Sequence, residues 1–517
     1  MSRTHKAAVL AAFTYVQFAL AIVTGIILVP LVLSHLGART YGLWLTTGEL
    51  VAYASMVELG VLGVMPWMLA EADGSRDRAA LGRLVSNGLT VGCLVGVGFA
   101  AIAVVLWSVL PSMLWLTSND RASVSPALAV MVVAIALTYP LRVYRAVLSG
   151  LQDVVFTGAL GIVEAAITAA VTITMLMKGY GVYALGCAAA ASTVFGSVAA
   201  TARVAYIAPD LVWQWQRPTA AEVRALFRNG IGVWFGMFGW QIIAASSSIV
   251  ITYIGHPEWV PVYACTAKLS AMSMQLGWIL PDSGLIGLAQ LHGEHPGSRR
   301  LAHRIEALLR LHLLLAGAGA CGVLAFNPAF VTRWVGAAFF AGSSLNALLA
   351  VGIVASSLVH GYLTVAAVLG RRLPVGVITL GNAGLQLVCA VVLGHRLGLL
   401  GIAAAGPLST ALISLPAGIH LLRMSGAVTI QEFFRDSILP WLIRVVPLAT
   451  AASLVGIFHA SMGIWSAGLL SALLGAAYVW HMRPLYHVLP VDPRWARWLV
   501  SLRLLPPMSA ATPMEQL

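Results

Sequence analysis

Charged residues are scarce in this sequence of 517 residues: only 9% are Asp, Glu, Lys or Arg, whereas 60% are apolar. An average soluble domain carries about a quarter charged residues. A water-exposed protein of this size could not cover its surface with so few charges. We therefore expect an all-α polytopic membrane protein.

Motifs for cofactors, metals and nucleic acid are also lacking. The five cysteines form no C-x-x-C pair, and no Gly is followed by Lys, so neither a zinc ribbon nor a P-loop is expected. The G-x-G-x-x-G match at Gly317–Gly322 lies inside an apolar run without a preceding strand, which favours helix packing. His292 and His295 lack a convincing third ligand. We expect no metal site, no cofactor and no nucleic-acid partner.

Long apolar runs are what the sequence has instead. A helix needs about 20 apolar residues to cross about 30 Å of hydrocarbon. By that criterion the sequence predicts about fourteen spans, at roughly 7–33, 42–69, 84–110, 126–150, 154–177, 181–207, 230–254, 261–289, 308–325, 345–369, 375–393, 399–422, 438–459 and 463–481. No connection exceeds roughly twenty residues, which leaves no room for a soluble catalytic domain.

The distribution of basic residues predicts the orientation of these spans. With the N-terminus in the cytoplasm, 23 of the 30 basic residues lie on the inside and only five in outside loops. This asymmetry follows the positive-inside rule. We expect a multi-pass protein of a bacterial cytoplasmic (inner) membrane with both termini in the cytoplasm.

An internal repeat predicts the domain organisation. A shift of about 219 residues lays the first six spans over the next six. Two lobes of six helices have the same topology, and substrate is expected between them. The predicted parts are an N-lobe at 1–218, a C-lobe at 219–428, two extra helices at 429–481 and a cytoplasmic tail at 482–517.

Two polar segments predict helices at the level of the lipid headgroups. Thr219-x-x-Glu222 is a capping-box pattern and predicts a short interfacial helix. In the tail, Asp492-Pro493 opens a segment rich in Arg and Trp, which is typical of an amphipathic helix on anionic lipid.

Several short patterns resemble a known family. They are Leu36-Gly37-Ala-Arg-Thr-Tyr41-Gly42-Leu-Trp44, Glu58-Leu59-Gly60, Leu148-Ser-Gly150-Leu-Gln152 and the run from Gly181 to Ala191. Together they resemble Wzx-type polysaccharide flippases of the multidrug/oligosaccharidyl-lipid/polysaccharide (MOP) exporter superfamily. Such proteins usually have Asp-x-Gly where this chain has Glu58. The resemblance implies a two-lobed bundle that moves undecaprenyl-diphosphate-linked oligosaccharide from the inner to the outer leaflet.

Two arginines inside the fourth span are candidate substrate ligands. Arg142 and Arg145 are three residues apart, hence on one helical face, just after the break at Tyr139-Pro140. Two guanidinium groups held in this way could grip a diphosphate with bidentate hydrogen bonds. Alternatively, both side chains snorkel to the inner headgroups.

Lys268, in the eighth span, is the third candidate substrate ligand. By the repeat it stands opposite Glu49, and we expect the two to pair across the cleft in one state. The substrate diphosphate then competes with Glu49 for Lys268 in another state. A static pair that joins the lobes is the alternative.

Three further carboxyl groups lie in apolar spans, where an ionised group costs at least ~2.5 kcal/mol. Glu58 and Glu164 lie deepest, so each is either a proton-coupling group or a neutral structural acid. Asp282 lies near the cytoplasmic end of its span, where a capping role is expected. With Glu49, these three are the candidate gating or ion-coupling residues.

These observations favour a flippase for lipid-linked oligosaccharide that is not an enzyme. Its expected partners are the lipid-linked glycan diphosphate, membrane lipids, and a glycan polymerase with its chain-length machinery. A cation-coupled small-molecule exporter of the MATE type is the main alternative. A membrane-embedded glycan polymerase or transferase, and a scaffold that transports nothing, are alternatives of another class.

Overall fold

The computed structural model describes residues 3–74, 76–213, 216–294, 298–425, 429–458 and 463–488, and every regular element in these ranges is helical. The chain forms two compact units, which we call unit 1 (Met1–Pro261) and unit 2 (Val262–Leu517). The predicted lobe boundaries at 218 and 428 stay predictions.

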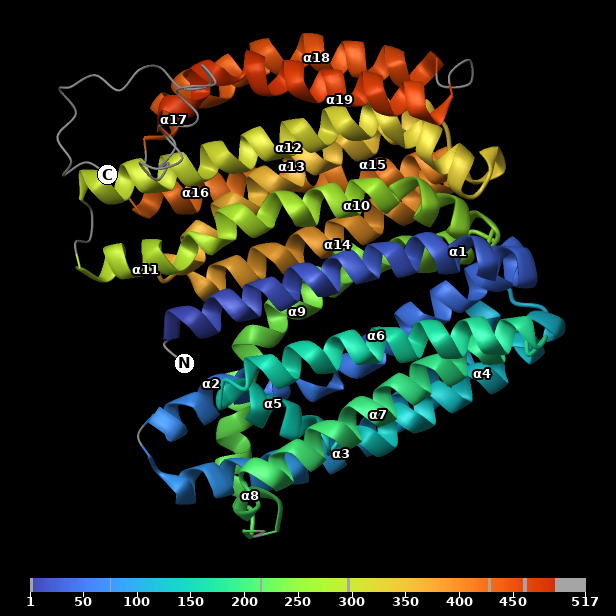
Figure 1. Cartoon of the computed structure of the whole chain (residues 1–517), viewed down its shortest axis with the longest axis vertical. Helices are drawn as coiled ribbons and strands as arrows, with labels where there is room; N and C mark the ends of the chain where they lie inside the picture. Colours follow the sequence, from blue (N-terminus) through green and yellow to red (C-terminus); the bar gives the residue numbers. More distant parts are fainter. Residues whose placement is uncertain are drawn as a thin grey trace. The chain divides into compact units, whose positions relative to one another are not determined.

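Unit 1 contains the helices of the first half of the chain (Figure 1). They are α1 (Arg3–Ser55), η1 (Met56–Glu58), α2 (Val61–Gly74), α3 (Arg78–Met113), α4 (Ser118–Thr138), α5 (Arg142–Gly150), α6 (Val154–Met177), α7 (Tyr183–Ile207), α8 (Asp210–Trp213) and α9 (Ala220–Tyr253).

Unit 2 contains the helices of the second half, and α10 begins just before its boundary. They are α10 (Trp259–Ser283), α11 (Leu285–Glu294), α12 (Arg299–Trp334), η2 (Ala337–Phe339), α13 (Ser343–Val368), α14 (Arg372–Leu397), α15 (Leu399–Ser409), η3 (Thr410–Ser414), α16 (Leu415–Ser425), α17 (Ile430–Phe433), η4 (Phe434–Ile438), α18 (Leu439–Ile457), α19 (Ile464–His481) and η6 (Arg483–Val488).

The helices agree with the predicted membrane spans. Within the described ranges, twelve helical segments are long and apolar enough to cross a membrane. The first of these, Phe13–Glu58, takes in one predicted span and the start of the next, because α1 continues across a kink at Gly37, where φ is 74°. Two predicted spans are each divided between two helices: the span at 126–150 between α4 and α5, and the span at 261–289 between α10 and α11. The all-α polytopic fold is thus confirmed.

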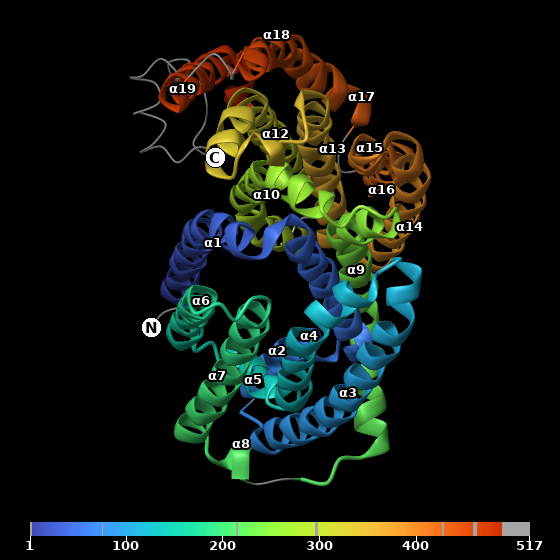
Figure 2. The same cartoon turned by 90° about the vertical axis from the view of Figure 1, so that its right-hand side faces the viewer.

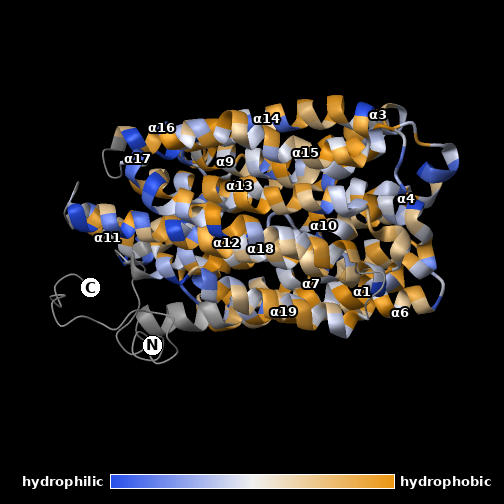
Figure 3. Cartoon of the chain, turned by 90° about the horizontal axis from the view of Figure 1, so that it is seen from above, coloured by the Kyte–Doolittle hydropathy of each residue, from blue (hydrophilic) through white to orange (hydrophobic). Residues whose placement is uncertain are grey.

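The surface of these helices is suited to lipid. Figure 3 shows hydrophobic residues along the middle of the helices and hydrophilic residues gathered near their ends. Large apolar side chains such as Val97, Leu137 and Trp465 are exposed in the protein alone. In water such exposure would be costly, whereas hydrocarbon tails can cover these side chains.

Unit 1 is held by close backbone packing and by an ion pair at one end. A side chain on Gly60 would contact the Gly230 carbonyl oxygen, so small residues let α9 approach the junction of η1 and α2. Beside the kink of α1, the Arg39 guanidinium donates to both carboxylate oxygens of Asp120, at 3.0 and 2.8 Å. Asp120 also completes the capping box that begins α4.

Unit 2 is organised around α12, whose most apolar stretch is 72% buried, whereas no other candidate span exceeds 39%. Tyr478 of α19 donates a hydrogen bond to the Leu314 carbonyl of α12 at 2.7 Å. The buried Arg310 guanidinium donates to Glu306 at 2.7 Å and to Ser437 of η4 at 2.9 Å. The two last predicted spans therefore pack on α12.

The prediction of a separate short interfacial helix at Thr219 is wrong. Thr219 is the N-cap of α9, and its Oγ1 accepts a hydrogen bond from the Glu222 backbone at 3.3 Å. The capped turn continues without interruption into the predicted seventh span, because nothing between Ala220 and Tyr253 breaks the helix. The predicted amphipathic segment at Asp492-Pro493 lies outside the described residues.

Candidate functional site

A cavity of about 470 Å³ lies inside unit 1. Its walls come from η1, α2, α5, α6 and α7 and from the residue before α5. The lining residues are Glu58, Leu62, Gly63, Pro66, Leu141, Arg142, Arg145, Ala146, Ser149, Glu164, Ser192, Thr193 and Ser197. Figure 2 views the helices nearly end-on and shows α2, α5 and α7 close together. The cavity therefore combines two arginines, two glutamates and four hydroxyl groups.

The short helix α5 carries both arginines to the cavity. It follows a turn at Tyr139, Pro140 and Leu141, where proline cannot donate a helical hydrogen bond. Within α5, Val143 and Val147 are fully buried in unit 1, whereas Arg142, Arg145 and Ser149 face the cavity. The spacing of three and four residues places these three polar side chains on one face of the helix. The sequence prediction of a shared face is thus correct.

Arg145 and Glu164 form an ion pair across the cavity, between α5 and α6. The side chain of Glu164 is 17% exposed and that of Arg145 is 48% exposed. A glycine on α7 makes room for the pair, because a Cβ atom on Gly196 would contact Glu164 Oε1 and would lie 2.9 Å from Arg145 Nη2. The pair thus lies between α5, α6 and α7.

Arg142 and Glu58 are linked through a buried tyrosine. The Arg142 guanidinium lies over the Tyr139 ring, 4.4 Å from its centre, a cation–π contact. The Tyr139 hydroxyl lies 3.0 Å from the Ser55 carbonyl oxygen and 3.4 Å from Glu58 Oε2, and both are acceptors for its hydrogen. The Arg142 side chain lines the cavity with no carboxylate within ion-pair distance among the described residues.

This arrangement can bind an anion that has several oxygens. Each guanidinium has five N–H donors in a planar fork that matches phosphate oxygens. The hydroxyl groups of Thr193 and Ser197 on α7 add further donors at the cavity wall, whereas that of Ser192 donates to the Glu164 backbone carbonyl at 3.3 Å. When no anion is bound, the Glu164 carboxylate offsets the charge of Arg145, and the Tyr139 ring contacts the guanidinium of Arg142.

The other predicted pair is distributed over both units. Glu49 lies half-buried on α1 in unit 1, one turn before Tyr53, and Lys268 lies half-buried on α10 in unit 2. The predicted pairing of Glu49 with Lys268 stays a prediction.

Asp282 has partners that sequence reasoning missed. Instead of capping a helix, its carboxylate lies 3.0 Å from His360 Nε2 of α13 and 3.9 Å from His312 Nε2 of α12. Both histidines lie in predicted spans, so a search for every titratable residue in apolar runs would have found them. Sequence reasoning also missed Gly196, whose role depends on helices that are distant in the chain.

The comparisons with known proteins concern the fold. No family model and no curated protein matches the chain. The inward closed lipid II flippase MurJ is similar at a TM-score of 0.67 with 9% identity, over 92% of this chain and 98% of that one. An inward-facing multidrug MATE transporter of the MOP superfamily gives 0.64 with 14% identity, over 80% and 94%. A Vibrio cholerae MATE transporter variant gives 0.54 with 14% identity, over 84% and 98%.

Proposed function

We propose that this protein, whose fold is that of the MATE and MurJ transporters, is a flippase for a lipid-linked oligosaccharide. Its substrate is an exopolysaccharide or O-antigen unit on undecaprenyl diphosphate, which it moves from the inner to the outer leaflet of a bacterial cytoplasmic membrane. Transport proceeds by alternating access, with both termini in the cytoplasm.

The observation that carries this proposal is the pair of arginines in the cavity of unit 1. A diphosphate crosses bare hydrocarbon slowly because its oxygens lose their hydration. Arg142 and Arg145 offer donors on one face of α5 and replace that hydration, while the polyprenyl chain stays in lipid. The paired Glu164 is displaced from Arg145 when the phosphate arrives.

The fold comparison supports the same proposal. The alignment with the lipid II flippase takes in 92% of this chain, whereas that with the inward-facing MATE transporter takes in 80%. By its name, that flippase acts on a lipid, lipid II. Lys268 is proposed as a further phosphate ligand that Glu49 neutralises in the other state of the cycle.

The test is a translocation assay in proteoliposomes. Undecaprenyl diphosphate that carries a fluorescent oligosaccharide is placed in both leaflets, and an impermeant reductant bleaches the outer one. We expect the wild-type protein to expose nearly the whole fluorescent pool, and the double variant R142Q/R145Q to slow translocation at least tenfold, because both guanidinium groups are lost.

A matched control comes from an ion pair of the same unit outside the cavity lining. Arg203 of α7 donates to Asp153, the N-cap of α6, at 2.8 Å. We expect R203Q to retain wild-type translocation. Bleaching of only half the pool with the wild-type protein, or a double variant as fast as R203Q, contradicts the proposal.

A cation-coupled exporter of small molecules is the second candidate. Two of the four ionisable residues at the cavity are carboxylates, and its volume lies within the range of about 300–1,000 Å³ typical of drug-sized ligands. An exporter of this kind should extrude a cationic dye from proteoliposomes under a proton or sodium gradient. This second function is supported if the wild-type protein exports the dye but does not translocate the labelled lipid, and if E58Q abolishes the export.

A further inference from the structure

Three ionisable side chains from three helices meet inside unit 2. They are Asp282 of α10, His312 of α12 and His360 of α13, and one ligand atom of each lies within 4.8 Å of the others. His360 Nε2 is 3.1 and 3.0 Å from the two oxygens of Asp282. His312 Nε2 is 3.9 Å from Asp282 Oδ1. The cluster does not belong to the cavity of unit 1.

The buried ring of His312 presents a lone pair to this cluster. Its side chain is 0% exposed, and its Nδ1 lies 3.0 Å from the Leu308 carbonyl oxygen. Because a carbonyl oxygen only accepts, Nδ1 carries the hydrogen, and in the neutral ring Nε2 carries a lone pair. Nε2 is buried and has no hydrogen-bond partner. It lies 3.9 Å from Asp282 Oδ1, so a nitrogen acceptor and a carboxylate oxygen are neighbours.

The ring of His360 is held in place by a second set of contacts. Trp278 stacks on it, with the ring centres 4.1 Å apart and the planes 7° from parallel. The Trp278 indole N–H in turn donates to Ser357 Oγ at 3.1 Å. Such packing fixes a histidine ring much as the outer contacts of metal ligands do.

We propose that Asp282, His312 and His360 bind one divalent transition-metal ion, with Zn²⁺ as the best match. Two histidine nitrogens and one carboxylate oxygen are a common zinc ligand set, and at metal–ligand distances of about 2.0–2.1 Å tetrahedral ligands lie roughly 3.3 Å apart. Two of the three present spacings, 3.0 and 3.9 Å, bracket that value, and all three lie within 4.8 Å.

Metal binding also gives a partner to the buried His312 Nε2. The ion occupies the space between the His312 lone pair and the carboxylate. The hydrogen of the neutral His360 ring moves by way of solvent from Nε2 to Nδ1, so that Nε2 offers a lone pair to the ion. Asp282 and His360 are 35% and 22% exposed, so one side of the ion stays open for a water molecule or another ligand. The bound ion links α10, α12 and α13.

The test measures metal binding by the full-length protein in detergent, purified through a tag without histidines and stripped with chelator. Zn²⁺ alone is titrated by calorimetry, and Co²⁺ alone is followed by its visible absorption. We expect one equivalent to bind, a tetrahedral Co²⁺ spectrum, and a rise in melting temperature. We expect D282N and H312Q to lose at least tenfold in affinity for Zn²⁺.

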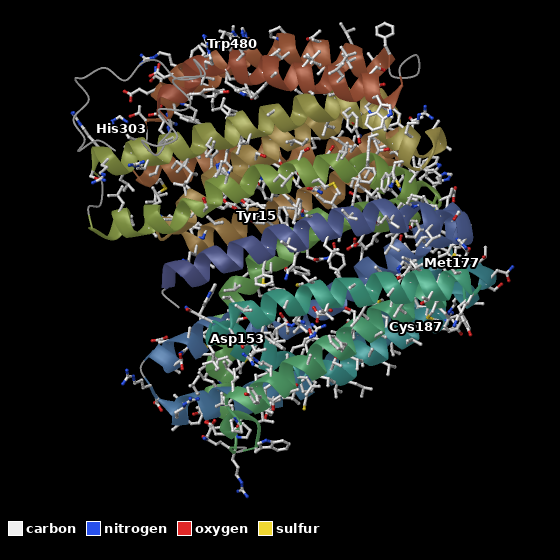
Figure 4. The ribbon with its side chains drawn as sticks, viewed as in Figure 1. Tyr15, Asp153, Met177, Cys187, His303 and Trp480 are labelled. Carbon is white, nitrogen blue, oxygen red and sulfur yellow. The ribbon has the colours of Figure 1, made fainter. Side chains whose placement is uncertain are left out.

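His303 provides the matched control, because it lies exposed on the same helix as His312 but outside the cluster (Figure 4). H303Q should bind Zn²⁺ like the wild type. If H312Q does not fold, D282N and H360Q decide the question, because both replaced side chains are partly exposed. Absence of one-equivalent binding by the wild type, or equal binding by D282N and H303Q, overturns the proposal. The cluster is then a hydrogen-bonded Asp–His pair without a metal.

Discussion

Substitutions of the two residues in the Arg145–Glu164 ion pair should change diphosphate binding in opposite directions. If the phosphate displaces Glu164 from Arg145, the carboxylate is a competitor of the substrate. E164Q then strengthens binding, because Arg145 no longer has to leave a charged partner, whereas R145Q weakens binding, because a phosphate ligand is lost. A pair that only supports the fold predicts the same direction for both variants.

The structure sets approximate limits on the change in Kd for each of the two variants. A partly exposed ion pair contributes about 0.2–1 kcal/mol, and the 17% exposure of Glu164 places this one near the upper end. Loss of about 1 kcal/mol of competition corresponds to roughly a fivefold lower Kd in E164Q. A hydrogen bond to a charged group contributes about 1.5–3 kcal/mol, so R145Q should raise the Kd roughly 10- to 150-fold.

The assay is calorimetric titration of the purified protein with farnesyl diphosphate, a short soluble relative of the proposed lipid. The matched controls are R203Q and D153N, which break an ion pair of similar exposure outside the cavity lining. Asp153 is labelled in Figure 4, at the start of α6. Both controls should leave the Kd within twofold of the wild type. If E164Q and R145Q weaken diphosphate binding equally and lower the melting temperature equally, the proposed competition between Glu164 and phosphate for Arg145 is refuted.

Three further substitutions test the packing. G196A should lower the free energy of unfolding by about 1–3 kcal/mol through overpacking at the cavity ion pair, whereas G236A, where a Cβ meets nothing within 4 Å, should not. R310M should cost roughly 3 kcal/mol, the low end for a broken buried pair, because its partner Glu306 is 25% exposed. Y478F leaves two buried hydrogen bonds unmade and should cost about 1–3 kcal/mol. Thermal unfolding in detergent measures all three, and unchanged melting temperatures contradict the described contacts.

The spans could be predicted because each depends on local sequence. The run at 154–177 coincides with α6 (Val154–Met177), since a helix in lipid must be apolar over its whole length. The break at Pro140 was likewise predictable, because proline acts on its own turn. The continuation of α1 through Gly37 could not be predicted. A glycine in the sequence does not show whether the chain turns back at that point or only bends, as it does here.

The candidate site, too, has features that the sequence predicts and features that depend on packing. The shared face of Arg142 and Arg145 follows from helical spacing alone, so the sequence was sufficient. The pairing of Arg145 with Glu164 depends on how α6 packs against α5 and on the space left by Gly196. The meeting of Asp282 with two histidines also depends on packing, since the three residues come from three helices. No local pattern specifies such contacts.

The charge balance of the cavity raises the question of what happens to the displaced Glu164 carboxylate. Its four ionisable residues sum to zero formal charge, so a bound diphosphate leaves a net negative cavity in an apolar surrounding. That state is unfavourable unless a displaced carboxylate moves into water or takes up a proton. E164Q resembles the protonated form of Glu164. If Glu164 takes up the proton, the advantage of E164Q over the wild type shrinks as the pH is lowered. If Glu164 only swings away, the ratio of the two Kd values stays constant with pH. Titrations at several pH values therefore distinguish proton coupling at this residue from a simple change of rotamer.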